Sequence, residues 1–128
     1  MSDYIGQLLC LGKATEADIE ELFSYRLGDN LSLIERQGSF KSAGRIDLLY
    51  KNRLGKYVLY ELKKGVAKLA ALEQIKRYMR SAKKKYKISA SDIAGVVLAH
   101  SIDPELALAL SKEPSIKAKK YFFGIDLK

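Results

Sequence analysis

Two short apolar segments joined by a tight turn constrain the fold of this chain more than any other feature. Residues 45–51 and 56–62 are rich in Ile, Leu, Val and Tyr, the residue types that strands favour. Between them, residues 53–55 read Arg-Leu-Gly, and a glycine in the third place suits a hairpin loop that needs a left-handed residue. The sequence therefore predicts two antiparallel strands with a fixed register.

This register brings two acids and a lysine together. Asp47 is predicted to lie opposite Glu61, and Lys63 points to the same face because side chains alternate along a strand. Carboxylates hold Mg²⁺ or Mn²⁺, hard cations that prefer oxygen ligands. The backbone carbonyl of Leu62, between the acid and the lysine, is a further candidate ligand. Such a set can hydrolyse a phosphodiester, because the metal activates water and the lysine stabilises the developing oxyanion.

An ordinary exposed cluster of charges across a hairpin is the alternative interpretation. Two features weigh against it. The neighbouring residues of both strands are apolar, so we expect the acids to be partly buried. Like charges directly opposite each other are destabilising unless a cation lies between them.

The remaining segments predict an α/β chain in the order α-β-β-β-α-β-α-β, a mixed sheet flanked by helices in a single domain over residues 1–128. The expected elements outside the hairpin are a helix from Thr15 to about Leu27, a strand Leu31–Arg36, a loop or weak strand end Gly38–Gly44, a helix from Val66 to about Lys83, a strand Ile93–Ala99, a helix from Asp103-Pro104 to about Lys112, and a strand Lys119–Leu127.

For two of these elements, the sequence also predicts which side chains share a face. In the strand from Leu31, we expect Leu31, Leu33 and Glu35 on one face. The buried side of the helix from Val66 is expected to comprise Leu69, Leu72, Ile75, Lys76 and Met79.

Gln74 and Tyr78 lie four residues apart, on one face of the helix from Val66. If this face approaches the hairpin, Gln74 can hydrogen-bond the lysine, a metal-bound water or a phosphate. The alternative is that both belong to a polar helix flank.

A dense basic run covers the end of the same helix, with Tyr78 and Tyr86 interleaved. Its members are Lys76, Arg77, Arg80, Lys83, Lys84, Lys85 and Lys87. Together with a formal net charge of +8, the run favours a polyanionic partner such as DNA. A solvated helix end, stabilised by the helix dipole, is the alternative.

Several classes of protein are disfavoured by composition. Cys10 and His100 are the only residues of their kinds, so neither a disulfide nor a zinc cluster can form within the chain. The N-terminal residues lack a signal-peptide pattern, and no stretch approaches about 18 apolar residues. We therefore expect a soluble cytoplasmic protein without a membrane partner.

Beyond these patterns, the chain resembles the catalytic domain of the NucS (EndoMS) endonucleases, which belong to the PD-(D/E)xK nuclease superfamily. The matching pieces occur in order over most of the chain: Thr15-Glu16-Ala17-Asp18-Ile19, Glu35-Arg36-Gln37, Gly44-Arg45-Ile46-Asp47-Leu48-Leu49, Tyr60-Glu61-Leu62-Lys63-Lys64-Gly65, Glu73-Gln74-Ile75-Lys76-Arg77-Tyr78, and more loosely Gly95-Val96-Val97-Leu98-Ala99 and Ile102-Asp103-Pro104.

The resemblance implies a restriction-endonuclease-like fold and a role for each matching residue. Asp47 and Glu61 match metal-binding carboxylates, Lys63 the catalytic lysine, and Gln74 a glutamine that borders the site. Glu16 matches an acid of the first helix that approaches the metal, a choice over Glu20 that the residues alone do not make. The candidate DNA-binding residues are Arg45, Tyr78, Lys76, Arg77, Arg80, Lys83 and Lys84.

We thus expect a Mg²⁺- or Mn²⁺-dependent DNA endonuclease that leaves a 5′-phosphate. The NucS proteins that the chain resembles carry a separate N-terminal DNA-binding domain, and only about fourteen residues precede the first expected helix here. A nuclease similar to Holliday-junction resolvases, acting as a homodimer, is an alternative, as are a non-catalytic nucleic-acid-binding module and a protein-binding protein. The residues do not identify the DNA structure cut or any specificity subunit.

Overall fold

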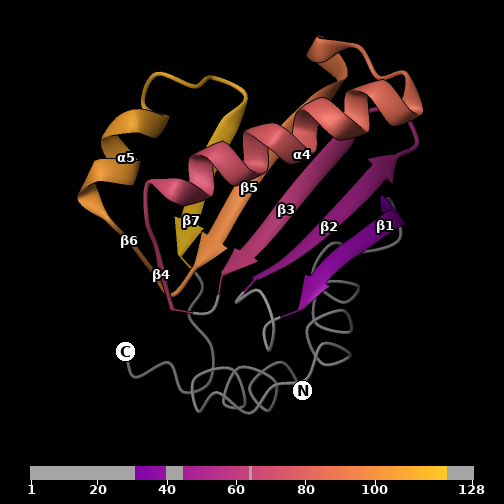
Figure 1. The fold of residues 1–128 in the computed structure, drawn as a ribbon. Coiled ribbons are helices and arrows are strands. Elements are labelled where there is room, and N and C mark those ends of the chain that lie inside the picture. The colour runs from indigo at the N-terminus through magenta and orange to yellow at the C-terminus, as the bar shows by residue number, and fades with distance from the viewer. Residues whose placement is uncertain (1–30, 40–44, 64, 121–128) are drawn as a thin grey trace, which may run out of the picture.

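The hairpin expected from the sequence forms part of a five-stranded sheet in the order β1-β2-β3-β5-β7 (Figure 1). The computed structural model describes residues 31–39, 45–63 and 65–120. The strands of this sheet are β1 (Leu31–Ser39), β2 (Arg45–Asn52), β3 (Tyr57–Lys63), β5 (Ile93–Ala99) and β7 (Ile116–Lys120). Strand β2 is antiparallel to both of its neighbours, β1 and β3, whereas β5 runs parallel to β3 and β7 parallel to β5, so the sheet is mixed as predicted.

The register of the β2–β3 hairpin is the predicted one, with Asp47 opposite Glu61 and Arg45 opposite Lys63. Gly55 has a φ of 82°, the left-handed conformation that the loop requires. The Asn52 side chain accepts hydrogen bonds from two backbone N–H groups of the turn, each at 2.9 Å. This local hydrogen bonding fixes the turn, and the turn fixes which side chains share a face.

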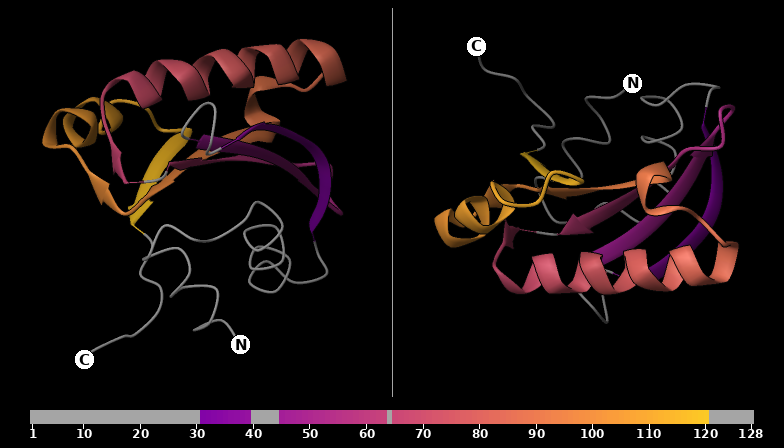
Figure 2. Two further views of the ribbon diagram at one scale, coloured as in Figure 1. Left: turned by 60° about the horizontal axis from the view of Figure 1, so that its bottom comes forward. Right: turned by 90° about the horizontal axis from the view of Figure 1, so that it is seen from above.

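One long helix, α4 (Ala70–Tyr86), lies across one face of the sheet (Figure 2). Its buried side chains pack against the α4-facing residues of β2, β3 and β5; they are Ala71, Leu72, Ile75, Met79 and Ala82. Gly95 of β5 allows this approach, because a Cβ there would lie 2.9 Å from Ile75 Cδ1 and 3.0 Å from Met79 Sδ. The opposite face of the hairpin carries a second buried cluster, Ile46, Leu48, Tyr50 and Leu62.

The helix predicted from Val66 begins later than expected. Gly65, at a φ of 95°, leads into a short strand β4 (Val66–Ala67), which pairs in parallel with β6 (Ser101–Ile102). Leu69 is consequently 42% exposed, and its predicted burial was wrong. Lys76 is half-buried and forms an ion pair at 3.2 Å with Glu113.

The same helix continues one turn beyond its predicted end near Lys83. Lys87 terminates it in the left-handed conformation with a φ of 55°, and the backbone N–H of Ile88 bonds the carbonyl of Lys83 at 2.9 Å. No glycine marks this end, so the sequence pattern could not locate it.

The C-terminal elements begin near their expected positions. After the short 3₁₀ turn Ala90–Asp92 and strand β5, helix α5 (Pro104–Leu110) starts where Asp103 caps it, accepting from the Glu105 N–H at 3.4 Å. It ends two residues before the expected Lys112, and β7 starts at Ile116 instead of Lys119. The helix from Thr15, most of the loop Gly38–Gly44 and the stretch after Lys120 lie outside the described residues. Within the described ranges, no helix is long and apolar enough to cross a membrane.

Candidate active site

Polar residues form a row across three strands on the face that α4 covers. Gln37 of β1 pairs with Asp47 of β2, which pairs with Glu61 of β3. On the other side of β3, Glu61 pairs with Val97 of β5. Arg45 and Lys63 form the adjacent pair, two residues along on the same face. The structure therefore brings together the two acids and the lysine as the sequence predicted.

Glu61 is fully buried, and Asp47 nearly so. Within the described part of the chain, neither carboxylate oxygen of Glu61 has a hydrogen-bond partner. A buried carboxylate without donors is costly, and the cost grows when a second acid lies opposite. The pair thus offers oxygen ligands to a divalent cation, and the cation would balance their negative charge.

Burial shifts the proton equilibria of both acids in the same direction. Burial, and after it the negative charge of Asp47, raises the pKa of Glu61 to about 8, against a smaller opposing effect of Arg45 and Lys63. Burial also raises the pKa of Asp47, an effect that the positive charge of Arg45 partly offsets. The Arg45 Nε lies 3.5 Å from Asp47 Oδ2 as an ion pair. Without a cation, the carboxyl of Glu61 therefore tends to hold a proton near neutral pH.

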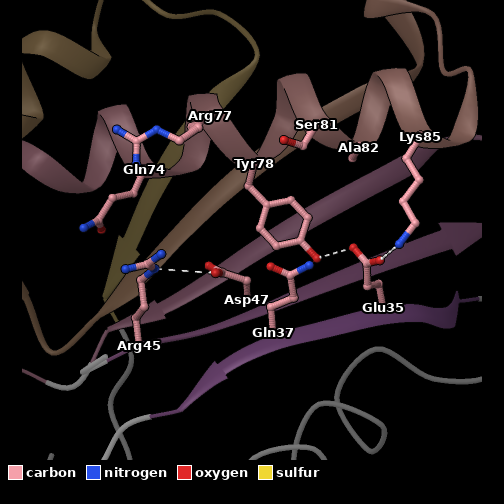
Figure 3. Close-up of a pocket in the computed structure, with 10 residues that line it drawn as sticks. All are labelled: Glu35, Gln37, Arg45, Asp47, Gln74, Arg77, Tyr78, Ser81, Ala82 and Lys85. Atoms are coloured by element: carbon pink, nitrogen blue, oxygen red, sulfur yellow. Dashed lines mark hydrogen bonds and ion pairs between the residues drawn. The ribbon is translucent and has the colours of Figure 1, made fainter. Parts of the chain in front are cut away.

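A pocket of about 210 Å³ opens between α4 and the edge of this row (Figure 3). From the strands it is lined by Glu35, Gln37, Arg45 and Asp47. From the helix it is lined by Gln74, Arg77, Tyr78, Ser81, Ala82 and Lys85. Helix α4 thus places Gln74 and Tyr78 on the side that faces the hairpin, as their spacing predicted. The Oε1 atom of Gln74 is buried and has no hydrogen-bond partner among the described residues.

Glu35 is a residue of this pocket whose role sequence reasoning missed. Its carboxylate accepts a hydrogen bond from Tyr78 Oη at 2.6 Å and another from Lys85 Nζ (Figure 3). A third hydrogen bond comes from Tyr86 Oη at 3.0 Å. The bond from Lys85, then that from Tyr78, lowers the pKa of Glu35. A register shift between Leu33 and Glu35 turns Glu35 toward α4, so the prediction that it shares a face with Leu33 was wrong. The motif Glu35-Arg36-Gln37 was the only sequence signal for this residue.

The candidate DNA-binding residues separate into two groups. Arg45, Arg77 and Tyr78 line the pocket. The others are not among its lining residues: Lys76 is paired with Glu113, Arg80 and Lys84 are exposed, and Lys83 is half-buried.

The described residues provide only part of the donor set that a metal ion needs. Among the residues that the structure describes, no group of three or more His, Cys, Asp or Glu side chains could hold a metal ion. Asp47 and Glu61 therefore provide two carboxylates, and the carbonyl of Leu62 stays a candidate ligand. Glu16, the predicted third acid, lies outside the described residues, as does the alternative Glu20.

The fold and this site together define an α/β protein with a mixed sheet, in which one helix covers a buried pair of acids beside a lysine. Residues 15–122 match the model of the endonuclease NucS C-terminal domain, and the chain belongs to this family. Among curated proteins, no significant match was found.

Solved structures with the same fold include three from endonucleases. EndoMS in its apo form is 23% identical, with a TM-score of 0.64, and covers 84% of this chain. A repair endonuclease from Pyrococcus abyssi is 25% identical, with a TM-score of 0.61 and the same coverage. An EndoMS–dsDNA complex is 22% identical, with a TM-score of 0.62 and 88% coverage. In each case the match spans 46% of the solved chain, so this chain corresponds to about half the length of those proteins.

Proposed function

We propose that this chain is a DNA endonuclease that depends on Mg²⁺ or Mn²⁺ and hydrolyses phosphodiester bonds at Asp47, Glu61 and Lys63. The observation that carries the proposal is the buried pair Asp47–Glu61, opposite each other on β2 and β3, with the Glu61 oxygens lacking donors in the described chain. Membership of the NucS C-terminal family supports it, and so do the endonucleases among the similar structures.

The position of each residue supports a role in this reaction. Asp47 and Glu61 would hold the cation, with the Leu62 carbonyl and Glu16 as further ligands. A bound cation supplies a Lewis acid for the phosphoryl group and lowers the pKa of water. Lys63, on the same face, orients the attacking water and offers positive charge to the oxyanion that forms. Gln74 lines the pocket beside Asp47 from α4, which supports a role as a donor to a phosphate oxygen or to the water.

Cleavage of labelled DNA by the purified protein in Mn²⁺ tests this function. We expect Asp47→Ala, Glu61→Ala and Lys63→Ala each to lower the cleavage rate by a factor of at least about 100, on the order of the loss of one transition-state contact. Circular dichroism should show that each variant stays folded. Lys117→Ala, an exposed residue of β7, is the matched control and should cut at the wild-type rate.

The proposal fails if the wild-type protein cuts none of a panel of mismatched duplexes, flaps, four-way junctions and single strands. Calorimetry then separates the alternatives. An enzyme site should bind Mn²⁺ and lose it in Asp47→Ala, whereas a non-catalytic nucleic-acid-binding module has no need of this metal site.

The substrate and the assembly stay predictions. One of the similar structures is an EndoMS–dsDNA complex, which supports duplex DNA as the partner. Another is a repair endonuclease, which supports DNA repair as the context. Cleavage of four-way junctions in the panel would favour a resolvase-like activity instead. The expected homodimer and cytoplasmic location are likewise proposals.

A further inference from the structure

The pocket beside Asp47 extends along α4 to a second group of polar side chains. Arg77, Ser81 and Lys85 follow one another at four-residue intervals, and all three line the pocket (Figure 3). Residues four apart share a face of a helix and advance by about 6 Å. A strand of nucleic acid that runs along α4 from Asp47 would therefore pass one hydrogen-bond donor per turn.

Lys85, the last of the three, is held by an acid in this structure. Its ammonium group bonds the carboxylate of Glu35, while 61% of the Lys85 side chain remains exposed. An exposed ion pair is screened by water and exchanges readily with another anion. Lys85 is thus available to a phosphate that offers a comparable or greater negative charge.

Glu35 would not be left as an unpaired buried charge by such an exchange. Its carboxylate also accepts from the hydroxyls of Tyr78 at 2.6 Å and Tyr86 at 3.0 Å. These two bonds stay when Lys85 leaves, so the penalty of an unsatisfied carboxylate does not arise. The tyrosines make the exchange of Lys85 possible without disturbing the packing of α4 on β1.

We propose that this end of the pocket is a subsite for a second backbone phosphate of the nucleic acid, bound by Arg77, Ser81 and Lys85, and that Lys85 transfers from Glu35 to that phosphate on binding. The subsite rests on the proposed function, because it presumes that the strand lies over Asp47. Arg77 contributes a planar fork of donors, Ser81 a hydroxyl donor, and Lys85 a mobile charge.

The interaction between Glu35 and Lys85 provides a direct test. Binding of a fluorescent oligonucleotide, single-stranded and duplex, is measured by anisotropy in EDTA over a range of salt concentrations. Lys85→Gln should weaken binding about 3- to 10-fold and reduce the slope of log affinity against log salt by about one. Glu35→Gln, which keeps an acceptor for the tyrosines, should tighten binding several-fold. In the double variant this gain should vanish, because no lysine remains to be released.

Two controls separate the subsite from general charge effects. Lys117→Gln removes a lysine from β7, at the opposite edge of the sheet, and should leave the salt slope nearly unchanged. Asp92→Asn removes an acid that pairs with Lys56 at 3.0 Å outside the pocket, and should not reproduce the gain of Glu35→Gln.

The subsite is overturned if Lys85→Gln behaves like Lys117→Gln, or if the gain from Glu35→Gln persists in the double variant. Cleavage in Mn²⁺ is measured separately on the wild-type protein. Binding that depends on Lys85 without any cleavage would contradict the nuclease and leave the phosphate subsite standing. Cleavage by a protein whose binding does not depend on Lys85 would support the nuclease and contradict the phosphate subsite.

Discussion

Glu61 occupies a position in which an uncharged side chain would be more stable. It is fully buried in the central strand of the sheet, and the acid opposite it, Asp47, is almost as buried. Within the described residues, no hydrogen bond to Glu61 offsets this cost. Such an arrangement is typical of a site where function, and not stability, determines the residue.

Glu61→Gln should therefore raise the stability of the protein in EDTA at pH 7. Relief of burial and repulsion is expected to contribute roughly 1–3 kcal/mol, on the scale that shifted pKa values imply. Urea denaturation followed by circular dichroism measures the change. Glu73→Gln, on the exposed side of α4, is the matched control and should change stability by less than about 0.5 kcal/mol. A loss of stability in Glu61→Gln would show that the ionised acid is well accommodated.

The pH dependence of stability follows from the same residue. Burial, together with the charge of Asp47, raises the pKa of Glu61 from its ordinary value of 4.5 to about 8. Between these values the folded state holds a proton that the unfolded state has lost, so stability should fall as pH rises from about 5 to 8. The slope should be close to 1 kcal/mol per pH unit in the wild-type protein and flatter in Glu61→Gln. An equal slope in both proteins would assign the titration to another group.

At the scale of elements, the edge strand β1 depends on a single glycine. Gly38 has a φ of 87° and pairs with Ile46, and a Cβ at Gly38 would lie 2.7 Å from the backbone carbonyl oxygen of Arg45. A backbone atom in a paired strand cannot move aside as the end of a side chain can. Since β1 also carries Glu35 and Gln37, this pairing positions one wall of the pocket.

Gly38→Ala should destabilise the protein by about 2–4 kcal/mol, because strain at a positive φ adds to a steric clash. Gly55→Ala tests the φ contribution alone: Gly55 has a φ of 82°, and its Cβ would meet nothing within 4 Å. This substitution should lower the free energy of unfolding by only about 1 kcal/mol. Thermal unfolding in EDTA compares the two, and equal losses would show that the clash is relieved by movement of β2.

Hairpin register and helix periodicity made the centre of the site predictable from the sequence. Asp47, Glu61 and Lys63 share a face because a three-residue turn fixes their pairing, and Gln74 lines the same pocket as Asp47 through its place on α4. The pairing of β4 with β6 joins residues more than thirty positions apart, which local patterns do not reveal. Glu35 was missed because one extra residue in β1 reverses its facing, and alternation alone assumes a regular strand.

For the whole molecule, the proposed metal site at the acidic pair would link metal binding to folding. A cation that binds the folded state alone stabilises it by mass action. Millimolar Mn²⁺ should raise the melting temperature of the wild-type protein by several degrees, equivalent to about 1–3 kcal/mol when the ion is at 10 to 100 times its dissociation constant. In Asp47→Ala the rise should disappear, and EDTA should reverse it in the wild type. A rise of the same size in both proteins would place the ion elsewhere.

The position of β3 within the sheet determines how long the arrangement of charges at the candidate site lasts. This strand carries Glu61 and Lys63 and is bonded to β2 on one side and to β5 on the other. Its central amide hydrogens can exchange with solvent only when the sheet itself opens, so local fraying at the edges leaves them protected. The spacing of the charges therefore persists for as long as the native state does, and its lifetime is set by the rate of global unfolding.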